Sequence, residues 1–380
     1  MSLEISNRRR AVKRALCWRA VKLRSRAPGG VLLLLAALAL ACAPGERAKV
    51  ERSAPVTGDV AAFPPVGPIA LRPSPPPAEG TLFQMLTSYS GRTEVTEEGG
   101  AAHDEPQTLD EEWALQVDYR ELPVVAPEGT LAFSFVLEAL KRRARLMPPG
   151  KQHVVEVADD RLRVSENDKV STDLRGAQPK EDLTPRSLLG KAFARMVTDS
   201  LGNPTGFTVT AVPTAKKILG SMFLREPLTY LALAYPDRPV APGETWHEKR
   251  YFPNPIGRLG LGADIEIRLV GYEKIADAPC AHVSLRAVMD EKDVKSDSGF
   301  TFDEVRYALQ GDAWLDLRNG QIVLERIEDN AAVAHKRSGG SMVPARVRMR
   351  YESRSVLQRL DAMPDSAKWA DGTKRFSAVK

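Results

Sequence analysis

Apolar and polar residues alternate along most of the chain between about residue 81 and residue 360. The pattern is clearest in residues 265–269, 281–287 and 346–351, where every second position is apolar or aromatic and the positions between are charged or polar. Successive side chains of a β-strand point to opposite faces, so a period of two predicts strands with one buried and one solvated face. Residues 131–137 alternate in the same way, although the basic run after them leaves a helix as an alternative.

Turn-forming residues separate many of the predicted strands. The dipeptide Asn319-Gly320 between two apolar runs is the strongest hairpin signal, since Asn and Gly accept the positive φ angles of tight hairpin turns. Residues 201–206 and the acidic pair 159–160 are further turn signals. Strands joined by short turns pair with their neighbours in sequence, which predicts an antiparallel sheet.

One stretch has the spacing of a helix. Residues 215–223 place four apolar side chains on one helical face, and Pro227 suits the start of a second short helix that ends near residue 234. If these helices cover the sheet, an apolar ligand would lie against their apolar face. The candidate ligand-facing residues are Ile218, Leu219, Met222 and Phe223.

The pattern as a whole predicts a mainly β fold. We expect a large curved antiparallel sheet, or a barrel-like sheet, with one or two short helices (about 215–234) packed on it. About twelve strands are expected in a single domain over residues 81–360. Residues 173–186 are the weakest point for a split into two domains, and residues 361–380 form a polar tail.

The start of the chain has a different composition. Residues 1–30 are basic and residues 31–41 are apolar. An apolar helix of that length is roughly 16 Å long, too short for a hydrocarbon core of about 30 Å. A signal peptide is therefore a better interpretation than a membrane-spanning helix.

The junction at residues 38–42, Leu-Ala-Leu-Ala-Cys, resembles a bacterial lipobox. In lipoproteins, small residues before a cysteine mark the cleavage site, and the cysteine thiol receives a diacylglycerol. The resemblance implies a signal peptide over residues 1–41 and a lipidated Cys42 that anchors the protein to a membrane. Ala43 in place of an acid implies delivery to the outer membrane, with the domain facing the periplasm or the surface. The alternative is an ordinary signal peptide cut near Ala41, with the cysteine incidental.

Proline dominates the segment that follows the cysteine. Nine prolines occur between residues 43 and 79, with no periodic apolar pattern. Proline lacks an amide hydrogen and favours the polyproline II conformation. Residues 42–80 are therefore interpreted as the lipidated cysteine followed by a disordered or semi-rigid linker, with a ligand for a proline-binding module as the alternative.

The net charge and the number of available cysteines both change when the predicted signal peptide is excluded. The whole chain has a net charge of +5, but residues 1–41 hold nine of its 54 Lys and Arg and one of its 49 acids, so the remainder carries −3. A weakly acidic chain lacks the basic footprint of a nucleic-acid-binding protein. Of the three cysteines, Cys17 lies in the signal peptide and Cys42 is modified, so Cys280 has no disulfide partner within the mature chain.

The sequence contains no complete catalytic or metal-binding set. His247-Glu248 begins like a zinc-protease helix, but Tyr251 stands where the second histidine is required. A nucleophile elbow and a phosphate-binding glycine loop are missing too. We therefore expect no enzyme activity, no cofactor and no bound metal. A hydrolase with an unrecognised site, which substitution of His247 or His282 would reveal, is kept as an alternative.

Three short motifs resemble an uncharacterised family of bacterial exported domains: Gly202–Phe207, Pro242–Trp246 and Gly311–Leu324. The resemblance covers roughly residues 81–335, and the family has no assigned activity. In architecture alone, the chain is similar to periplasmic lipid-handling lipoproteins, in which a curved sheet holds helices against an apolar cavity. The sequence thus predicts a membrane-tethered, non-catalytic binding or scaffolding domain of the bacterial cell envelope, whose ligand is a partner protein or an apolar molecule. A carrier of lipid or of another apolar ligand is the alternative.

The substitution Cys42→Ala in the full-length protein, produced in a bacterium with two membranes, tests the lipid anchor. Without the thiol no diacylglycerol is attached, and burial of acyl methylenes, at about 0.8 kcal/mol each, no longer holds the chain on a bilayer. We expect the variant in the soluble envelope fraction. The parent is expected in the membrane fraction, with an acylated N-terminal peptide by mass spectrometry. Cys17→Ala is the matched control, and membrane retention of Cys42→Ala would contradict the prediction.

Overall fold

The computed structural model describes residues 63–97, 107–158, 160–175, 185–209, 233–251, 262–295, 301–339 and 342–362. All of them belong to one compact unit, Ala54–Lys380. The predicted signal peptide, Cys42, the predicted helices up to residue 232 and most of the predicted tail lie outside the described residues. In the described ranges, no helix has the length and apolar character needed to cross a membrane.

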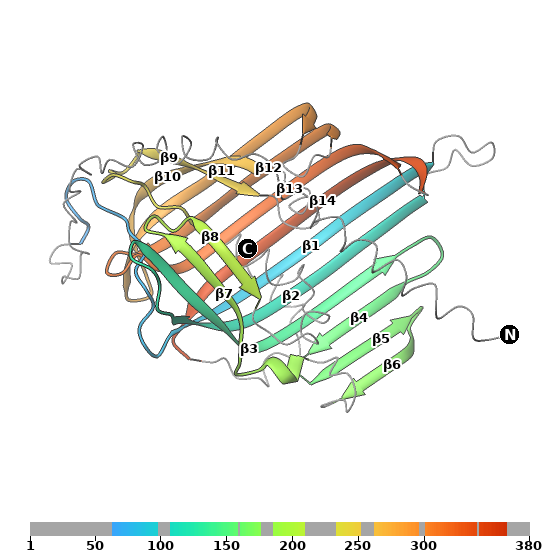
Figure 1. Ribbon diagram of the computed structural model, residues 1–380, viewed down its shortest axis with the longest axis horizontal. Coiled ribbons are helices and arrows are strands. Elements are labelled where there is room, and N and C mark those ends of the chain that lie inside the picture. The colour runs from blue at the N-terminus through green and yellow to red at the C-terminus, as the bar shows by residue number, and fades with distance from the viewer. Residues whose placement is uncertain are drawn as a thin grey trace, which may run out of the picture. The chain divides into compact units, whose positions relative to one another are not determined.

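The described strands form one 14-stranded antiparallel sheet (Figure 1). In chain order they are β1 (Thr81–Glu97), β2 (Gln107–Pro123), β3 (Thr130–Met147), β4 (His153–Ala158), β5 (Arg161–Glu166), β6 (Lys169–Arg175), β7 (Ala192–Asp199), β8 (Pro204–Val209), β9 (Thr245–Tyr251), β10 (Gly262–Ile275), β11 (Ala278–Lys295), β12 (Thr301–Asp316), β13 (Ile322–Gly339) and β14 (Met342–Leu360). A 3-10 helix, Pro185–Leu188, precedes β7. The predicted mainly β fold is confirmed, and of its two expected forms the open sheet is observed, with β6 and β9 as the ends of its main path.

The strand order places the first and last strands of the domain in the middle of the sheet. From one edge to the other the order is β6-β5-β4-β3-β2-β1-β14-β13-β12-β11-β10-β9. Each half is therefore a meander of strands that are neighbours in sequence, and the halves join where β1 pairs with β14. That pairing runs without a register shift from Leu82↔Leu360 to Glu97↔Ala345. In Figure 1 the blue first strand lies beside the red last one at the centre of the sheet.

The long strand β3 has two different neighbours along the same edge. Its first part, Thr130–Val136, pairs with β7, and its second part, Arg142–Leu146, pairs with β4. Met196 on β7 and Leu357 on β14 line one small pocket, although four strand-to-strand steps separate the two strands. Four steps on a flat sheet would span about 19 Å. The sheet therefore curls over at the β7 end.

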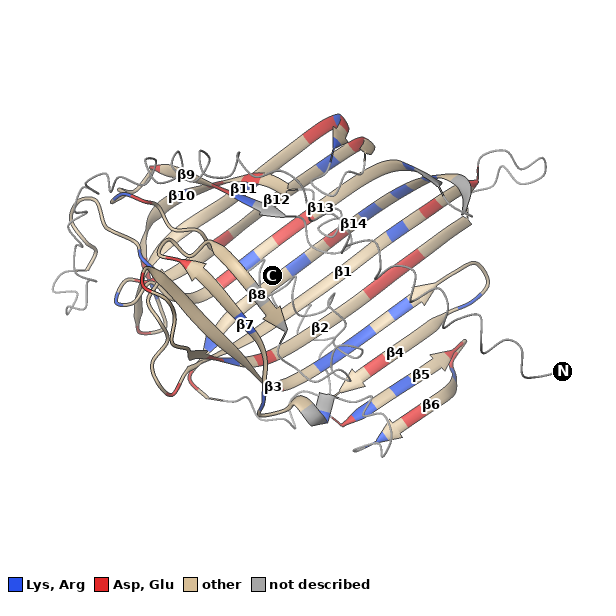
Figure 2. Ribbon diagram, viewed as in Figure 1, with Lys and Arg blue, Asp and Glu red and all other residues tan. Residues whose placement is uncertain are grey.

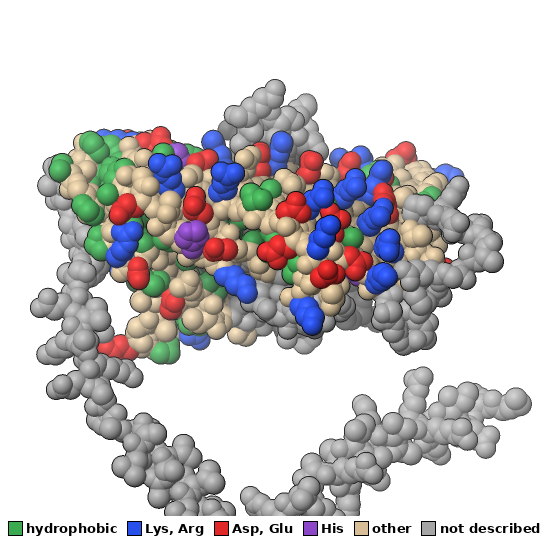
Figure 3. Space-filling model, turned by 90° about the horizontal axis from the view of Figure 1, so that it is seen from above, with side chains coloured by type: hydrophobic (Ala, Val, Ile, Leu, Met, Phe, Trp, Pro, Cys, Tyr) green, Lys and Arg blue, Asp and Glu red, His purple; other side chains and the backbone are tan. Residues whose placement is uncertain are grey.

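The alternation in the sequence separates an apolar face of the sheet from a charged one. Ile265 and Ile267 on β10 are 0% exposed, while Glu266 between them is exposed on the opposite face. Figure 2 shows charged positions recurring along the long central strands, and Figure 3 shows acidic and basic side chains interspersed on the surface. Exposed ion pairs such as Arg92–Asp110, with Nε 2.6 Å from Oδ1, are screened by water and contribute little, whereas a fully buried Ile contributes about 1.5–3 kcal/mol.

The predicted hairpins are present in the structure. Residues 159–160 lie between β4 and β5, and residues 201–206 contain the connection from β7 to β8. Asn319-Gly320 joins β12 to β13, but the connection is longer than the two-residue turn that this dipeptide favours, since Leu317–Gln321 separate the strands. The Asn319 side chain accepts a 3.0 Å hydrogen bond from the backbone nitrogen of Gln321 and so closes the longer loop.

The last part of the predicted linker packs on the sheet. Ile69 and Val240 exchange backbone hydrogen bonds of 2.8 and 2.9 Å. Arg72 lies against the loop between β12 and β13, where its carbonyl oxygen would collide with a Cβ on Gly320, whose φ of +69° also favours glycine. We call residues 69–74 the docking segment. The folded domain thus begins before its predicted start.

Gly311 on β12 tests how closely the strands of the sheet approach one another. An added Cβ there would lie 2.5 Å from the backbone oxygen of Arg326 on β13, so Gly311→Ala forces the strands apart. Gly271 on β10 is the matched control, because nothing lies within 4 Å of its added Cβ. We expect Gly311→Ala to lower the free energy of unfolding by about 1–3 kcal/mol and Gly271→Ala to change it by less than about 0.5 kcal/mol. Urea unfolding of the full-length variants measures this, and equal midpoints would contradict the register of β12 against β13.

Candidate functional site

A pocket of about 90 Å³ lies on the apolar face of the sheet, at the end where β7 curls over. Phe83 of β1, Phe133 of β3 and Leu357 of β14 contribute apolar walls, and all three belong to one cluster of buried hydrophobic residues. Pro73 of the docking segment and Leu233 add further walls. We call this cavity the apolar pocket.

Six polar side chains line the apolar pocket, those of Ser74, Tyr119, Glu121, Thr198, Tyr235 and Gln321. The alternation of inward and outward positions along β2 explains two of them, Tyr119 and Glu121. Leu115, Val117 and Tyr119 on this strand are at most 1% exposed and face the core. Glu121 follows at the next position of the same period, so it falls on the same face and lines the pocket with Tyr119. Thr198 on β7 lines the pocket from another strand.

Glu121 has no compensating charge in the pocket. The residues that line the pocket include no Lys, Arg or His, and no residue in the described ranges forms a hydrogen bond with this carboxyl. Loss of water is therefore the dominant effect, and burial raises the pKa of Glu121 to about 8. The carboxyl is mainly protonated at neutral pH, so it both donates and accepts a hydrogen bond.

Two hydroxyl groups accompany this carboxyl. Thr198 is 2% exposed, and within the described ranges its Oγ1 atom has no hydrogen-bond partner. Tyr119 is 1% exposed, and burial raises the pKa of its phenol well above the usual value, so the hydroxyl stays protonated. A buried polar group without a partner costs about 1–3 kcal/mol and is rare in native proteins. The pocket thus contains polar groups whose hydrogen-bonding capacity the described residues leave unused.

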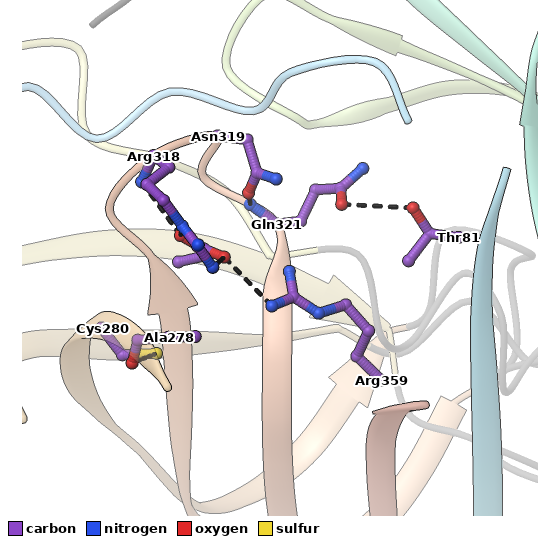
Figure 4. A network of polar contacts seen from close by, with 8 residues as sticks. Thr81, Ala278, Cys280, Arg318, Asn319, Gln321 and Arg359 are labelled. Carbon is purple, nitrogen blue, oxygen red and sulfur yellow. Dashed lines mark hydrogen bonds and ion pairs between the residues drawn. The ribbon is translucent and has the colours of Figure 1, made fainter. Parts of the chain in front are cut away.

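A buried carboxylate fixes the loop that forms one wall of the pocket. The side chain of Asp316 is 1% exposed and accepts hydrogen bonds from Nη2 of Arg318 at 2.7 Å and from Nη2 of Arg359 at 3.0 Å (Figure 4). Burial alone would raise the pKa of Asp316, but the hydrogen bonds from the two arginines outweigh it and lower the pKa. Thr81 donates a 3.2 Å hydrogen bond to Oε1 of Gln321, which lines the pocket. The loop is thus tied to both β1 and β14.

The charged face of the sheet is also hollowed, over β1 and β10 to β14. This polar groove has a volume of about 1130 Å³. Acids and arginines line it together, and opposite charges side by side give it no single-sign potential that would steer a charged ligand. These residues are Glu266, Arg268, Arg286, Asp312, Arg326, Glu328, Glu352 and Arg354.

His282 lies beside the polar groove between two acids. Its Nδ1 is 3.1 Å from Oε1 of Glu273 and its Nε2 is 2.8 Å from Oδ1 of Asp312, while the ring stacks on Trp314 with centroids 4.8 Å apart. His247, on β9, has a side chain that is 55% exposed. Across the described ranges, no group of three or more His, Cys, Asp or Glu residues is placed to hold a metal ion. The two histidines of the hydrolase alternative thus lie on separate strands, outside the apolar pocket.

The sequence and the structure point to different residues for a ligand site. The predicted ligand-facing residues Ile218, Leu219, Met222 and Phe223 lie outside the described residues, as does the predicted lipidation site Cys42. The sequence does not single out Tyr119, Glu121 or Thr198. The sequence does contain a signal for Glu121. It is an acid at the position that follows Leu115, Val117 and Tyr119 in the series of inward-facing residues of β2. No local sequence pattern predicts that β7 lies near β2. The sequence therefore could not identify Thr198 as a residue of the same site.

Comparison with known proteins adds little to this picture. Neither a family model nor a curated protein matches the sequence, so the resemblance to exported bacterial domains stays a prediction. Lipovitellin, in a structure described for its lipid–protein interactions, matches with a TM-score of 0.38 and 9% identity over 76% of this chain, which spans 26% of the lipovitellin chain. The translocator domain of the autotransporter NalP from Neisseria meningitidis has a TM-score of 0.19 and 9% identity over 74% of this chain and 88% of that domain. A FadL homologue from Pseudomonas aeruginosa has a TM-score of 0.12 and 8% identity over 73% and 90% of the two chains. Similarity this low supports no argument about function.

The raised pKa of Glu121 predicts a pH-dependent stability. The folded state keeps a proton up to about pH 8 that the unfolded chain loses near pH 4.5. The folded state therefore binds more protons in this window, and stability falls as the pH rises through it, by at most about 1.4 kcal/mol per pH unit. Glutamine does not titrate in this pH range, so we expect Glu121→Gln to lose this part of the pH dependence of stability.

Urea unfolding of the parent and of Glu121→Gln at pH 5.5 and pH 8 measures the difference. Burial also raises the pKa of Asp329, to about 7, and this residue contributes with the same sign in both proteins. The comparison of the two proteins thus isolates Glu121. The same loss of stability in both would show that Glu121 is solvated.

Proposed function

We propose that this protein is a non-catalytic, lipid-anchored binding protein of the bacterial cell envelope, whose β domain holds the apolar part of a ligand in the apolar pocket. The observation that carries the proposal is the composition of the pocket. Its walls are aromatic and aliphatic, yet Tyr119, Glu121 and Thr198 line it with polar groups that lack hydrogen-bond partners among the described residues. Ligand sites typically combine apolar walls with a few such convergent polar groups.

The size of the pocket limits what it takes up in this conformation. Its volume of about 90 Å³ is below the ~150 Å³ of an engineered cavity that binds benzene. The pocket thus suits a chain end or a small ring, and a whole lipid requires a wall to move. Pro73 and Ser74 form one wall that could move, because they belong to the docking segment, which is not a strand of the sheet.

The proposed anchor keeps the pocket near a source of apolar ligands. Between Cys42 and Phe63, the first described residue, an extended chain spans at most about 70 Å. The mature chain carries a net charge of −3, so a basic patch is not what would hold it to a membrane. A triacylated cysteine supplies two or more acyl chains, which is sufficient for a stable anchor.

A second candidate function is docking of an envelope protein on the polar groove. The hollowed surface and the 67% exposed Val288 within it favour this alternative. Some charges of the groove, however, already have partners, as in Arg354–Glu328 at 3.3 Å and Asp312–His282 at 2.8 Å. Among the described residues, Glu121 and Thr198 of the apolar pocket have no hydrogen-bond partner, and for this reason we prefer the apolar ligand.

Small molecules that co-purify with the protein test the proposal. Full-length protein is extracted mildly from a bacterial envelope, and an organic extract is analysed by mass spectrometry. We expect a stoichiometric hydrophobic compound with the parent and its loss with Leu357→Phe, because the larger side chain fills the pocket. Leu140→Phe is the matched control, since Leu140 belongs to the same buried cluster but does not line the pocket. A parent that repeatedly carries no compound, or a filled variant that carries as much as the parent, would contradict the proposal.

A further inference from the structure

Three polar side chains of the apolar pocket come from two strands that are not neighbours. Tyr119 and Glu121 lie two residues apart on one face of β2, and Thr198 lies on β7, on the far side of β3. The cavity between them measures about 90 Å³. Because the cavity is small, one small ligand group inside it would lie close to all three residues.

Each of these side chains offers a hydrogen bond at neutral pH. Thr198 and Tyr119 have hydroxyl groups, and Glu121 has a protonated carboxyl. An alkane would offer a hydrogen bond to none of the three, and Thr198 Oγ1 would stay without a partner as it is in the described part of the chain. A ligand oxygen with lone pairs accepts hydrogen bonds from them and removes that cost.

A charged ligand group fits the pocket poorly. An anion would enter with no positive side chain among the lining residues and would lie beside Glu121. A cation would require Glu121 to lose its proton, and both ions would have to lose their water. A buried ion pair regains that cost only with additional hydrogen bonds and very good geometry.

We therefore propose that the apolar pocket recognises the uncharged oxygen of an otherwise apolar molecule, such as an alcohol, ester or amide, through Tyr119, Glu121 and Thr198. The inference rests on the proposed binding function and adds the chemical class of the ligand. The preference for an uncharged oxygen over an alkane comes from Thr198 on β7 together with Tyr119 and Glu121 on β2.

Four probes with the same pentyl chain test this inference: pentan-1-ol, pentane, pentylamine and pentanoate. Saturation-transfer NMR measures their dissociation constants with the full-length chain carrying Cys42→Ala, which needs no detergent, at pH 6.5. We expect pentan-1-ol to bind about fivefold or more tightly than pentane, the equivalent of one net hydrogen bond, and about tenfold or more tightly than either ion.

Thr198→Val removes the pocket hydroxyl and keeps the shape of the side chain. We expect it to reduce the preference for pentan-1-ol over pentane by about threefold or more and, because an unpaired hydroxyl is gone, to raise the unfolding midpoint of the free protein. Thr87→Val is the matched control, since Thr87 is 5% exposed and its hydroxyl already bonds to Oγ of Ser355 at 3.1 Å. This control is expected to keep the preference and to lower the midpoint.

The outcomes separate the two proposals. Absence of saturation transfer to all four probes would overturn the binding function itself. Binding in which pentane equals pentan-1-ol, or in which an ion binds most tightly, would leave that function standing and overturn the inference. If Thr198→Val does not fold, Glu121→Gln replaces it. The affinity of the parent for pentan-1-ol is expected to fall as the pH rises through about 8, and that of Glu121→Gln is expected to stay constant. The same pH dependence in both would overturn the role of Glu121.

Discussion

The pairing of β1 with β14 is the interaction on which the rest of the sheet depends. It joins a meander that begins with β1 to a second meander that ends with β14, through an unbroken register from Leu82↔Leu360 to Glu97↔Ala345. Without it, each half would present a bare strand edge and an unpaired apolar face. The same pairing places Phe83 and Leu357 beside the apolar pocket. The two strands are far apart in sequence, so their pairing also closes the longest loop of the fold.

The curl of the sheet at β7 turns an ordinary apolar face into a pocket. The strand β3 is long enough to pair with β7 along its first part and with β4 along its second part. The direction of β7 therefore need not follow that of β4. It brings Thr198 to the residues of β2 and leaves a small space between them. A hydroxyl and a carboxyl without partners in that space reduce stability. Polar groups buried without partners are expected at functional sites, where a bound molecule can form the missing hydrogen bonds.

The docking segment connects the two parts of the proposed function. It belongs to the first described range after the predicted anchor, and it both bonds to the domain and lines the pocket. Ile69 pairs with Val240, Leu71 is 3% exposed, and Pro73 and Ser74 face the cavity. The chain that leads from the membrane is therefore also a wall of the site. Displacement of this wall would enlarge the pocket without disturbing the strands of the sheet.

The sequence by itself determined the class of fold and its hairpins. Alternation in stretches such as 265–269 is a local property that fixes which face a side chain occupies, and Asn319-Gly320 marks a turn wherever it stands. The Cys42 anchor stays a prediction, which the resemblance of residues 38–42 to a lipobox implies. Only the tertiary structure decided the central place of β1 beside β14, the packing of Arg72 against Gly320, and the presence of Glu121 and Thr198 in one pocket. These features depend on contacts between residues far apart in the chain, and a local period contains no information about which distant strands meet.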